Sequence, residues 1–177
     1  ASKIAEDEYL RVFEKMGDRL GLAHMLQHFG FVRYHAGNLA AGTEYWLKSL
    51  QITRQLGAIS HSAFTLLNLG IDAAIQNNYP EALEYLTESD DLFRKLKNEP
   101  KIAHVAAMLV ITYSGLDDAE NAHKFLSEAL PRARHLNCQF LMSLSLTGAV
   151  AYRLITDDPE GAAVLMGVVD NYPYTTW

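Results

Sequence analysis

Histidine is the residue of this sequence that most suggests chemistry, because imidazole can bind metal ions or transfer protons. His24 and His28 lie four residues apart, so on a helix both imidazoles project from one face and could share a zinc ion. No Cys, Asp or Glu on the same predicted helix completes a tetrahedral ligand set, although His104 occupies the same repeat position as His24. We therefore predict no metal site and interpret these histidines as part of a polar, partly exposed surface.

Acid–base and nucleophilic catalysis have less support. Adjacent acids include the three pairs Asp90–Asp91, Asp117–Asp118 and Asp157–Asp158. Two of these pairs fall where a helix is expected to begin, a position at which an aspartate caps the free amides. The sequence contains no phosphate-binding glycine loop, GxSxG elbow or HExxH helix. We predict no catalytic residues and no cofactor.

Three arginines recur at forty-residue intervals: Arg54, Arg94 and Arg134. Such a row of cations could follow an extended acidic ligand. Repeat-spaced charge in stacked-repeat proteins is more often structural. We favour the interpretation that these arginines brace successive units through carboxylates or carbonyls.

The arginines belong to a forty-residue period that runs through the chain in windows starting at Ala23, Ala63, Ala103 and Ser143. The sixteenth position of each window is Asn38, Asn78, Asp118 and Asp158. The twentieth is Gly42, Ala82, Ala122 and Ala162, and the twenty-fourth is Trp46, Leu86, Leu126 and Met166. Self-similarity at this period indicates stacked units, each of which buries its apolar face only against its neighbours.

Each unit is predicted to form two helices. In the first unit, Leu26, Phe29 and Val32 recur at helical spacing, the pattern ends at Gly37, and Asn38 then stands where a cap belongs. The links between units are short, which favours antiparallel neighbours. The small residues of the twentieth position would let the two helices of a hairpin approach closely. These patterns predict an all-α solenoid of helical hairpins.

The predicted organisation is one repeat domain over residues 1–177. Residues 1–22 match the second helix of a preceding partial repeat, and four repeats follow: 23–62, 63–102, 103–142 and 143–177. We expect the chain to be a segment of a longer protein.

Composition narrows the function class. The net charge of −6 does not favour nucleic acid, whose phosphates attract clustered Lys and Arg. No apolar run reaches membrane-spanning length, so we predict no membrane contact. The single cysteine, Cys138, excludes an internal disulfide and fits a reducing compartment. We expect a cytoplasmic location.

The repeat resembles the tetratricopeptide repeat family, and this resemblance implies an all-α, right-handed α-solenoid. Its small-residue positions correspond to Gly30 and Gly70 in the first helices and to Ala82 in a second helix, and NYPEALEYL (78–86) is similar to the family's turn and second helix. The first-helix Trp and the closing Pro of the family are missing, and six extra residues lengthen each unit. This longer form resembles repeats in the C-terminal sensor regions of bacterial signal-transducing ATPases, including LuxR-family regulators.

The resemblance implies a binding surface. In this family the first helices line a concave groove, and the corresponding positions here are His24, Gln27, His28, Phe31, Tyr34, His35, Phe64, Asn68, Ile71, His104, Met108 and Ile111. Only Asn68 matches the Lys and Asn set with which one subclass grips a C-terminal carboxylate, so capture of a chaperone tail is not expected. Aromatic, imidazole and apolar groups suit a peptide, an apolar helix or a small effector. Alternatively, several of these residues pack inside a tight superhelix.

These expectations favour a non-enzymatic module of a larger regulatory protein, active in transcription or signalling, that binds a protein or peptide or senses an effector. The alternative is a structural segment that mediates self-association into a homo-oligomer through apolar ends, which include Tyr172, Tyr174 and Trp177.

Overall fold

The computed structural model describes residues 3–170 and, within them, the side chains of residues 6–169. The described chain forms only α-helices: α1 (Lys3–Met16), α2 (Arg19–His35), α3 (Leu39–Gln55), α4 (Ile59–Ile75), α5 (Tyr79–Lys95), α6 (Glu99–Gly115), α7 (Ala119–His135), α8 (Gln139–Ile155) and α9 (Pro159–Asp170). None of them is both long and apolar enough to cross a membrane. Tyr172, Tyr174 and Trp177 lie outside the described residues.

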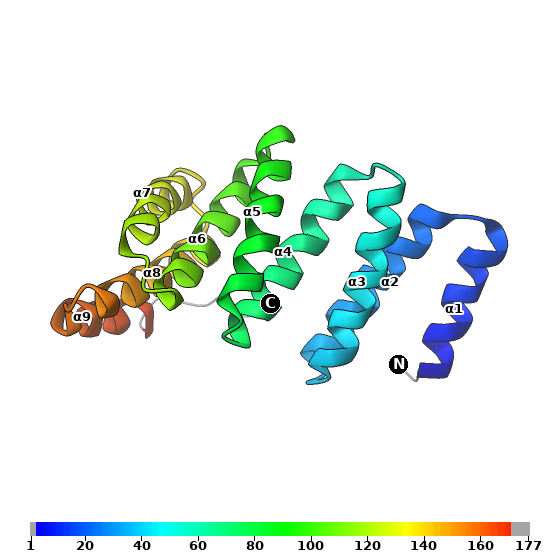
Figure 1. Ribbon diagram of the computed structural model, residues 1–177, viewed down its shortest axis with the longest axis horizontal. Helices are drawn as coiled ribbons and strands as arrows, with labels where there is room; N and C mark the ends of the chain where they lie inside the picture. The colour runs from blue at the N-terminus through cyan, green and yellow to red at the C-terminus, as the bar shows by residue number, and fades with distance from the viewer. Residues whose placement is uncertain (1–2, 171–177) are drawn as a thin grey trace.

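The helices pair into antiparallel hairpins that stack in a row from α1 to α9 (Figure 1). The hairpins are α2 with α3, α4 with α5, α6 with α7, and α8 with α9, while α1 packs on α2 as an unpaired helix. Most long-range contacts join neighbouring elements of this row. The all-α solenoid predicted from the sequence is therefore confirmed.

The two helices of a hairpin cross where one of them has little or no side chain. A Cβ added to Gly30 would lie 2.5 Å from the Trp46 ring, and a Cβ added to Gly70 would lie 2.6 Å from Leu86 Cγ. Ala82 is fully buried at this level of the second hairpin. The small residues of the first helix thus make room for the large residue of the second. The buried Ala82 agrees with the close approach predicted for the twentieth repeat position.

A buried hydroxyl repeats the same connection in two hairpins. Ser49 Oγ donates a hydrogen bond to the Ala23 carbonyl at 2.8 Å. Ser89 Oγ donates to the Ala63 carbonyl at 2.9 Å. Both serines are fully buried, so each bond holds its second helix at a fixed height on the first.

Most predicted helix caps are confirmed. Asn38, Asp118 and Asp158 accept hydrogen bonds from backbone amides three residues ahead. Asn78 stands at the cap position of α5, but it does not cap through its side chain. Its amide donates instead to Glu81 Oε2 at 2.6 Å, because the acid in the first turn offers a charged acceptor.

Every described link between helices passes through one residue of left-handed conformation. The early links use Gly17, Gly37 and Gly57, whereas the later links place Asn77, Lys97, Asp117, Asn137 and Asp157 there. Asn and Asp tolerate positive φ comparatively well, but Lys97, with a φ of 52°, does not. The later turns therefore keep the geometry of the early ones without glycine.

A buried ion pair attaches α1 to the first hairpin. Glu6 is 1% exposed, and its Oε2 accepts hydrogen bonds from Arg33 Nη2 at 3.0 Å and from the Tyr45 hydroxyl at 3.0 Å. Burial, together with this hydrogen bond to Glu6, raises the pKa of Tyr45 to about 12. One carboxylate thus joins α1 to both α2 and α3.

Replacing Ala82 or Ala122 by leucine is expected to lower the free energy of unfolding by about 1–3 kcal/mol, because the extra methyl groups would force the paired helices apart. Urea or thermal unfolding measures the change. Ala163→Leu, at an exposed position of α9, is the matched control and should change stability by less than about 0.5 kcal/mol. Melts of the two buried-site variants that coincide with the parent would contradict the close crossing.

Lys97→Gly is expected to raise the free energy of unfolding by about 1 kcal/mol, because glycine adopts positive φ without a steric cost. Lys95→Gly, in the last turn of α5, removes the same side chain from a helical position and should lower stability by up to about 1 kcal/mol. The two variants should therefore move the urea midpoint in opposite directions. If both urea midpoints moved in the same direction, the effect of Lys97→Gly would come from the lost charge and not from the backbone conformation.

Candidate functional site

The residues predicted to line the groove come from α2, α4 and α6, and we call the face on which they lie the first-helix surface. On α2 its exposed members are His24, His28, Phe31 and His35. Phe31 is 53% exposed, and its ring lies 4.1 Å from the His35 ring, centroid to centroid. An exposed phenylalanine beside imidazoles offers a mixed apolar and polar contact area.

Gln27 connects α2 to α4. Its Nε2 donates to the His61 carbonyl at 2.8 Å and lies within hydrogen-bond distance of the Thr65 hydroxyl. The His24 and His61 rings meet edge to face, with centroids 6.0 Å apart. Gln27 therefore holds the first two units together and is committed to the protein itself.

Between α4 and α6 the surface carries a cation on an aromatic ring. Lys101 Nζ lies 4.6 Å from the centroid of the half-buried Phe64 ring. Burial lowers the pKa of Lys101. Since the ring face attracts cations, Phe64 offsets part of the cost of removing the ammonium from water.

His104 is a neutral member of the surface. Burial, with a smaller contribution from the Lys101 charge, lowers the pKa of His104 to about 4. Its ring meets the Phe140 ring edge to face, with centroids 5.1 Å apart. At neutral pH this imidazole can donate and accept hydrogen bonds but carries no charge.

Some of the predicted residues serve packing. Met108 is only 6% exposed and belongs to the core between α4 and α6, so its assignment to an open groove is wrong. Tyr34 is half-buried and packs on Trp46 at 5.2 Å between ring centroids. Asn68, Ile71 and Ile111 are half-buried, and the two isoleucines pack against the same core. The internal packing considered from the sequence thus applies to part of the set.

Sequence reasoning missed His61, Lys101 and Phe140, which lie against predicted members of the surface. His61 and Lys101 occupy the same repeat position, two residues before Ala63 and Ala103, so the period itself could have found them. Among the described residues, no group of three His, Cys, Asp or Glu side chains is arranged to hold a metal ion.

The repeating arginines lie on the second helices, and two of them act as braces. Arg54 pairs with Glu88 across α3 and α5. Arg94 pairs with Asp90 at 2.6 Å within α5 and with Glu128 of α7 at 2.8 Å. The structural interpretation is confirmed for these two arginines.

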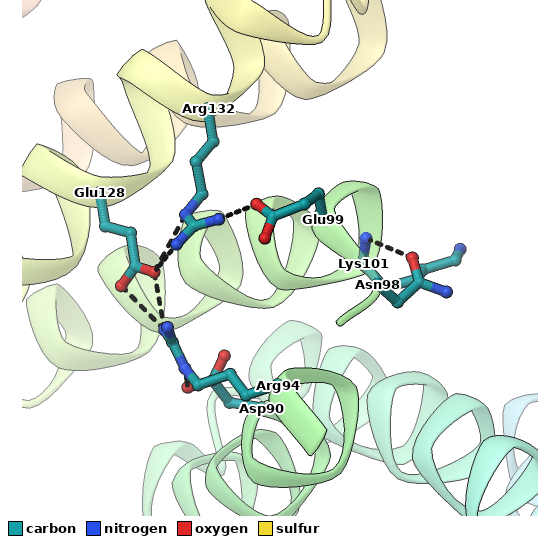
Figure 2. A network of polar contacts seen from close by, with 7 residues as sticks. All are labelled: Asp90, Arg94, Asn98, Glu99, Lys101, Glu128 and Arg132. Atoms are coloured by element: carbon teal, nitrogen blue, oxygen red, sulfur yellow. Dashed lines mark hydrogen bonds and ion pairs between the residues drawn. The ribbon is translucent and has the colours of Figure 1, made fainter. Parts of the chain in front are cut away.

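Arg132 extends the network around Arg94. Figure 2 shows Glu128 between Arg94 and Arg132, with Arg132 also reaching Glu99 of α6. Arg134, the third member of the row, is exposed and makes no ion pair with the residues that the structure describes. Val168 occupies the repeat position that holds Glu88 and Glu128 in the earlier units. The carboxylate with which Arg54 and Arg94 pair is therefore missing for Arg134.

Comparison with known proteins agrees with this geometry. Residues 21–95 match the tetratricopeptide repeat family. BtubC from P. vanneervenii has a similar structure, with a TM-score of 0.69 and 17% identity over 88% of this chain and 67% of that one. A signal transduction ATPase with numerous domains from Pyrococcus horikoshii, described as having a tetratricopeptide repeat sensor, gives a TM-score of 0.77 and 20% identity over 93% of this chain.

This chain spans only 26% of the length of the Pyrococcus protein. The search of curated proteins gives no match. At 17% and 20% identity, these two structures support the solenoid fold alone.

The pKa of about 4 at His104 makes stability depend on pH. An unfolded histidine titrates near about 6.5, so between these values the unfolded chain binds more protons and the free energy of unfolding falls as pH falls. Comparing urea unfolding at about pH 7 and about pH 4.5, we expect His104→Gln to remove about 1–3 kcal/mol of this loss. His135→Gln, at an exposed position of α7, is the control. Equal pH dependence of His104→Gln and the parent would contradict a neutral, half-buried His104.

Proposed function

We propose that this chain is a non-enzymatic binding module that takes a peptide, an apolar helix or a small effector on its first-helix surface. The observation that carries the proposal is Phe31, an exposed aromatic side chain among the imidazoles of His24, His28 and His35. Large exposed aromatic residues in mixed surroundings are typical of binding surfaces. Hydrophobic contact would supply most of the affinity, and the polar groups would set the orientation.

A regulatory context is the second part of the proposal, and one of the comparisons supports it. The Pyrococcus protein is described as a signal-transducing ATPase whose tetratricopeptide repeats form a sensor. We extend this role to the present chain and infer that it is a sensor segment of a larger cytoplasmic regulator, active in transcription or signalling. The long repeat form and the resemblance to LuxR-family regulators belong to the same proposal.

Self-association is the second candidate, and exposed apolar residues at both ends of the solenoid favour it. On α1, Tyr9 is 61% exposed and Met16 is 71% exposed. On α9, Val164 is 69% exposed and Met166 is 51% exposed. Sedimentation of this chain beside a longer form of the protein separates the candidates: a dimer in both favours self-association, and a monomer in the longer form favours ligand binding.

The binding proposal is tested with the double variant Phe31→Ala with Asn68→Ala, measured against a partner recovered by pull-down with the parent chain. Affinity is expected to fall at least tenfold, because the variant removes the exposed ring and an orienting amide. Leu56→Ala is the control, since Leu56 is 41% exposed at the end of α3. The proposal would be contradicted if the double variant kept its affinity while replacement of Arg54, Arg94 and Arg134 abolished binding. The binding site would then lie on the second helices.

A further inference from the structure

A cleft lies between α3, α4 and α5, on a different side of α4 from Phe64, Asn68 and Ile71. Its volume is about 600 Å³, within the range of small-molecule sites. Leu39 and Leu47 of α3 form apolar walls and are 37% and 45% exposed. The cleft can therefore take a small ligand or a single side chain.

A buried carboxylate lines the cleft, and only one of its two oxygens accepts a hydrogen bond from the protein. Asp72 is 2% exposed, and its Oδ2 accepts a hydrogen bond from the Thr43 hydroxyl at 2.6 Å. Its Oδ1 is buried and has no hydrogen-bond partner among the described residues. Since a buried carboxylate oxygen without a donor costs free energy, a cation in the cleft would be attracted to Asp72, and a rotation of that side chain would let the cation donate to Oδ1.

The rest of the lining is acidic and already organised. Glu81 accepts hydrogen bonds from Asn78 Nδ2 at 2.6 Å and from the Tyr85 hydroxyl at 3.2 Å. Glu44, which pairs with Lys48 at 2.6 Å, supplies a third carboxylate. The lining residues include no lysine or arginine. The corresponding cleft between α1, α2 and α3 contains its own cations, Arg33 and Lys48.

The repeat explains why this junction is open. Ala73 occupies the position that holds Arg33 one unit earlier and Tyr113 one unit later. Arg33 pairs with Glu6, and Tyr113 stacks on Phe125 with ring centroids 5.6 Å apart. The small side chain of Ala73 leaves that volume unfilled. At the preceding position the three units have Val32, Asp72 and Thr112, so only this unit places a carboxylate there.

We propose that the cleft between α3, α4 and α5 binds an organic cation, an ammonium or guanidinium group on a short apolar stem. The cation donates to Asp72 Oδ1, and the stem lies against Leu39 and Leu47. A free amine and the side chain of a lysine or arginine in a peptide share this chemistry. The cleft is separate from the first-helix surface, so this inference does not depend on the proposed function.

The test is a titration of the ¹⁵N-labelled chain with n-butylammonium and n-butylguanidinium, followed by amide chemical shifts. We expect both cations to cause saturable changes in the amide chemical shifts of Thr43, Asp72 and Ala73. The control is n-butanol, which has the same apolar stem without the charge and should cause no such change. Blocked tripeptides with a central lysine or arginine form the second arm. Tighter binding of a tripeptide than of the free amine assigns the cation to a peptide, and the reverse assigns it to a small molecule.

Two variants and one control decide the mechanism. Asp72→Asn keeps an acceptor for Thr43 but removes the charge, and it should weaken binding at least tenfold. Ala73→Tyr introduces into the cleft the side chain that stacks on Phe125 one unit later, and it should abolish binding. Asp91→Asn, at an exposed position of α5, makes the same change in net charge and should leave affinity unchanged. The proposal is overturned if no probe gives saturable shifts, or if Asp72→Asn binds as tightly as the parent.

Discussion

The spacing of the whole solenoid depends on the approach of two helices at a point where one has almost no side chain. Gly30 receives the ring of Trp46, and Gly70 receives Leu86. Because the contact is made against backbone, a larger residue cannot be accommodated by a change of rotamer. The hydroxyls of Ser49 and Ser89 then fix the height of each second helix. The residues between successive units differ, while this connection within the hairpin is repeated.

Once the helix spacing is set, the residues between units are free to differ. Arg33, Ala73 and Tyr113 occupy one repeat position, yet one forms an ion pair, one leaves a cleft and one stacks on a ring. A stacked-repeat fold allows this because each unit touches only its neighbours, so a change at one junction does not propagate. Individual junctions can therefore acquire separate chemistry.

The sequence predicted the helices well because their signals are local. Asn38 begins α3, and Ala82 is buried where the period required a small residue. The surface was harder to predict, because exposure depends on how far one unit tilts against the next. Met108 shares a repeat position with Asn68, but α6 is packed on both sides and encloses the methionine. The cation–ring contact of Lys101 with Phe64 likewise joins two units and has no short-range signal.

The ion pairs of the second helices have a consequence for the mechanics of the chain. Arg54 with Glu88, and Arg94 with Glu128, tie successive second helices through side chains that are partly in contact with water. Dissolved salt screens such charges, whereas it hardly affects the buried apolar contacts on which the hairpins rest. We therefore expect the row of second helices to bend more easily as the ionic strength rises, while the packing within each hairpin stays the same. In mechanical terms, the elasticity of the solenoid would then depend on the medium as well as on the fold.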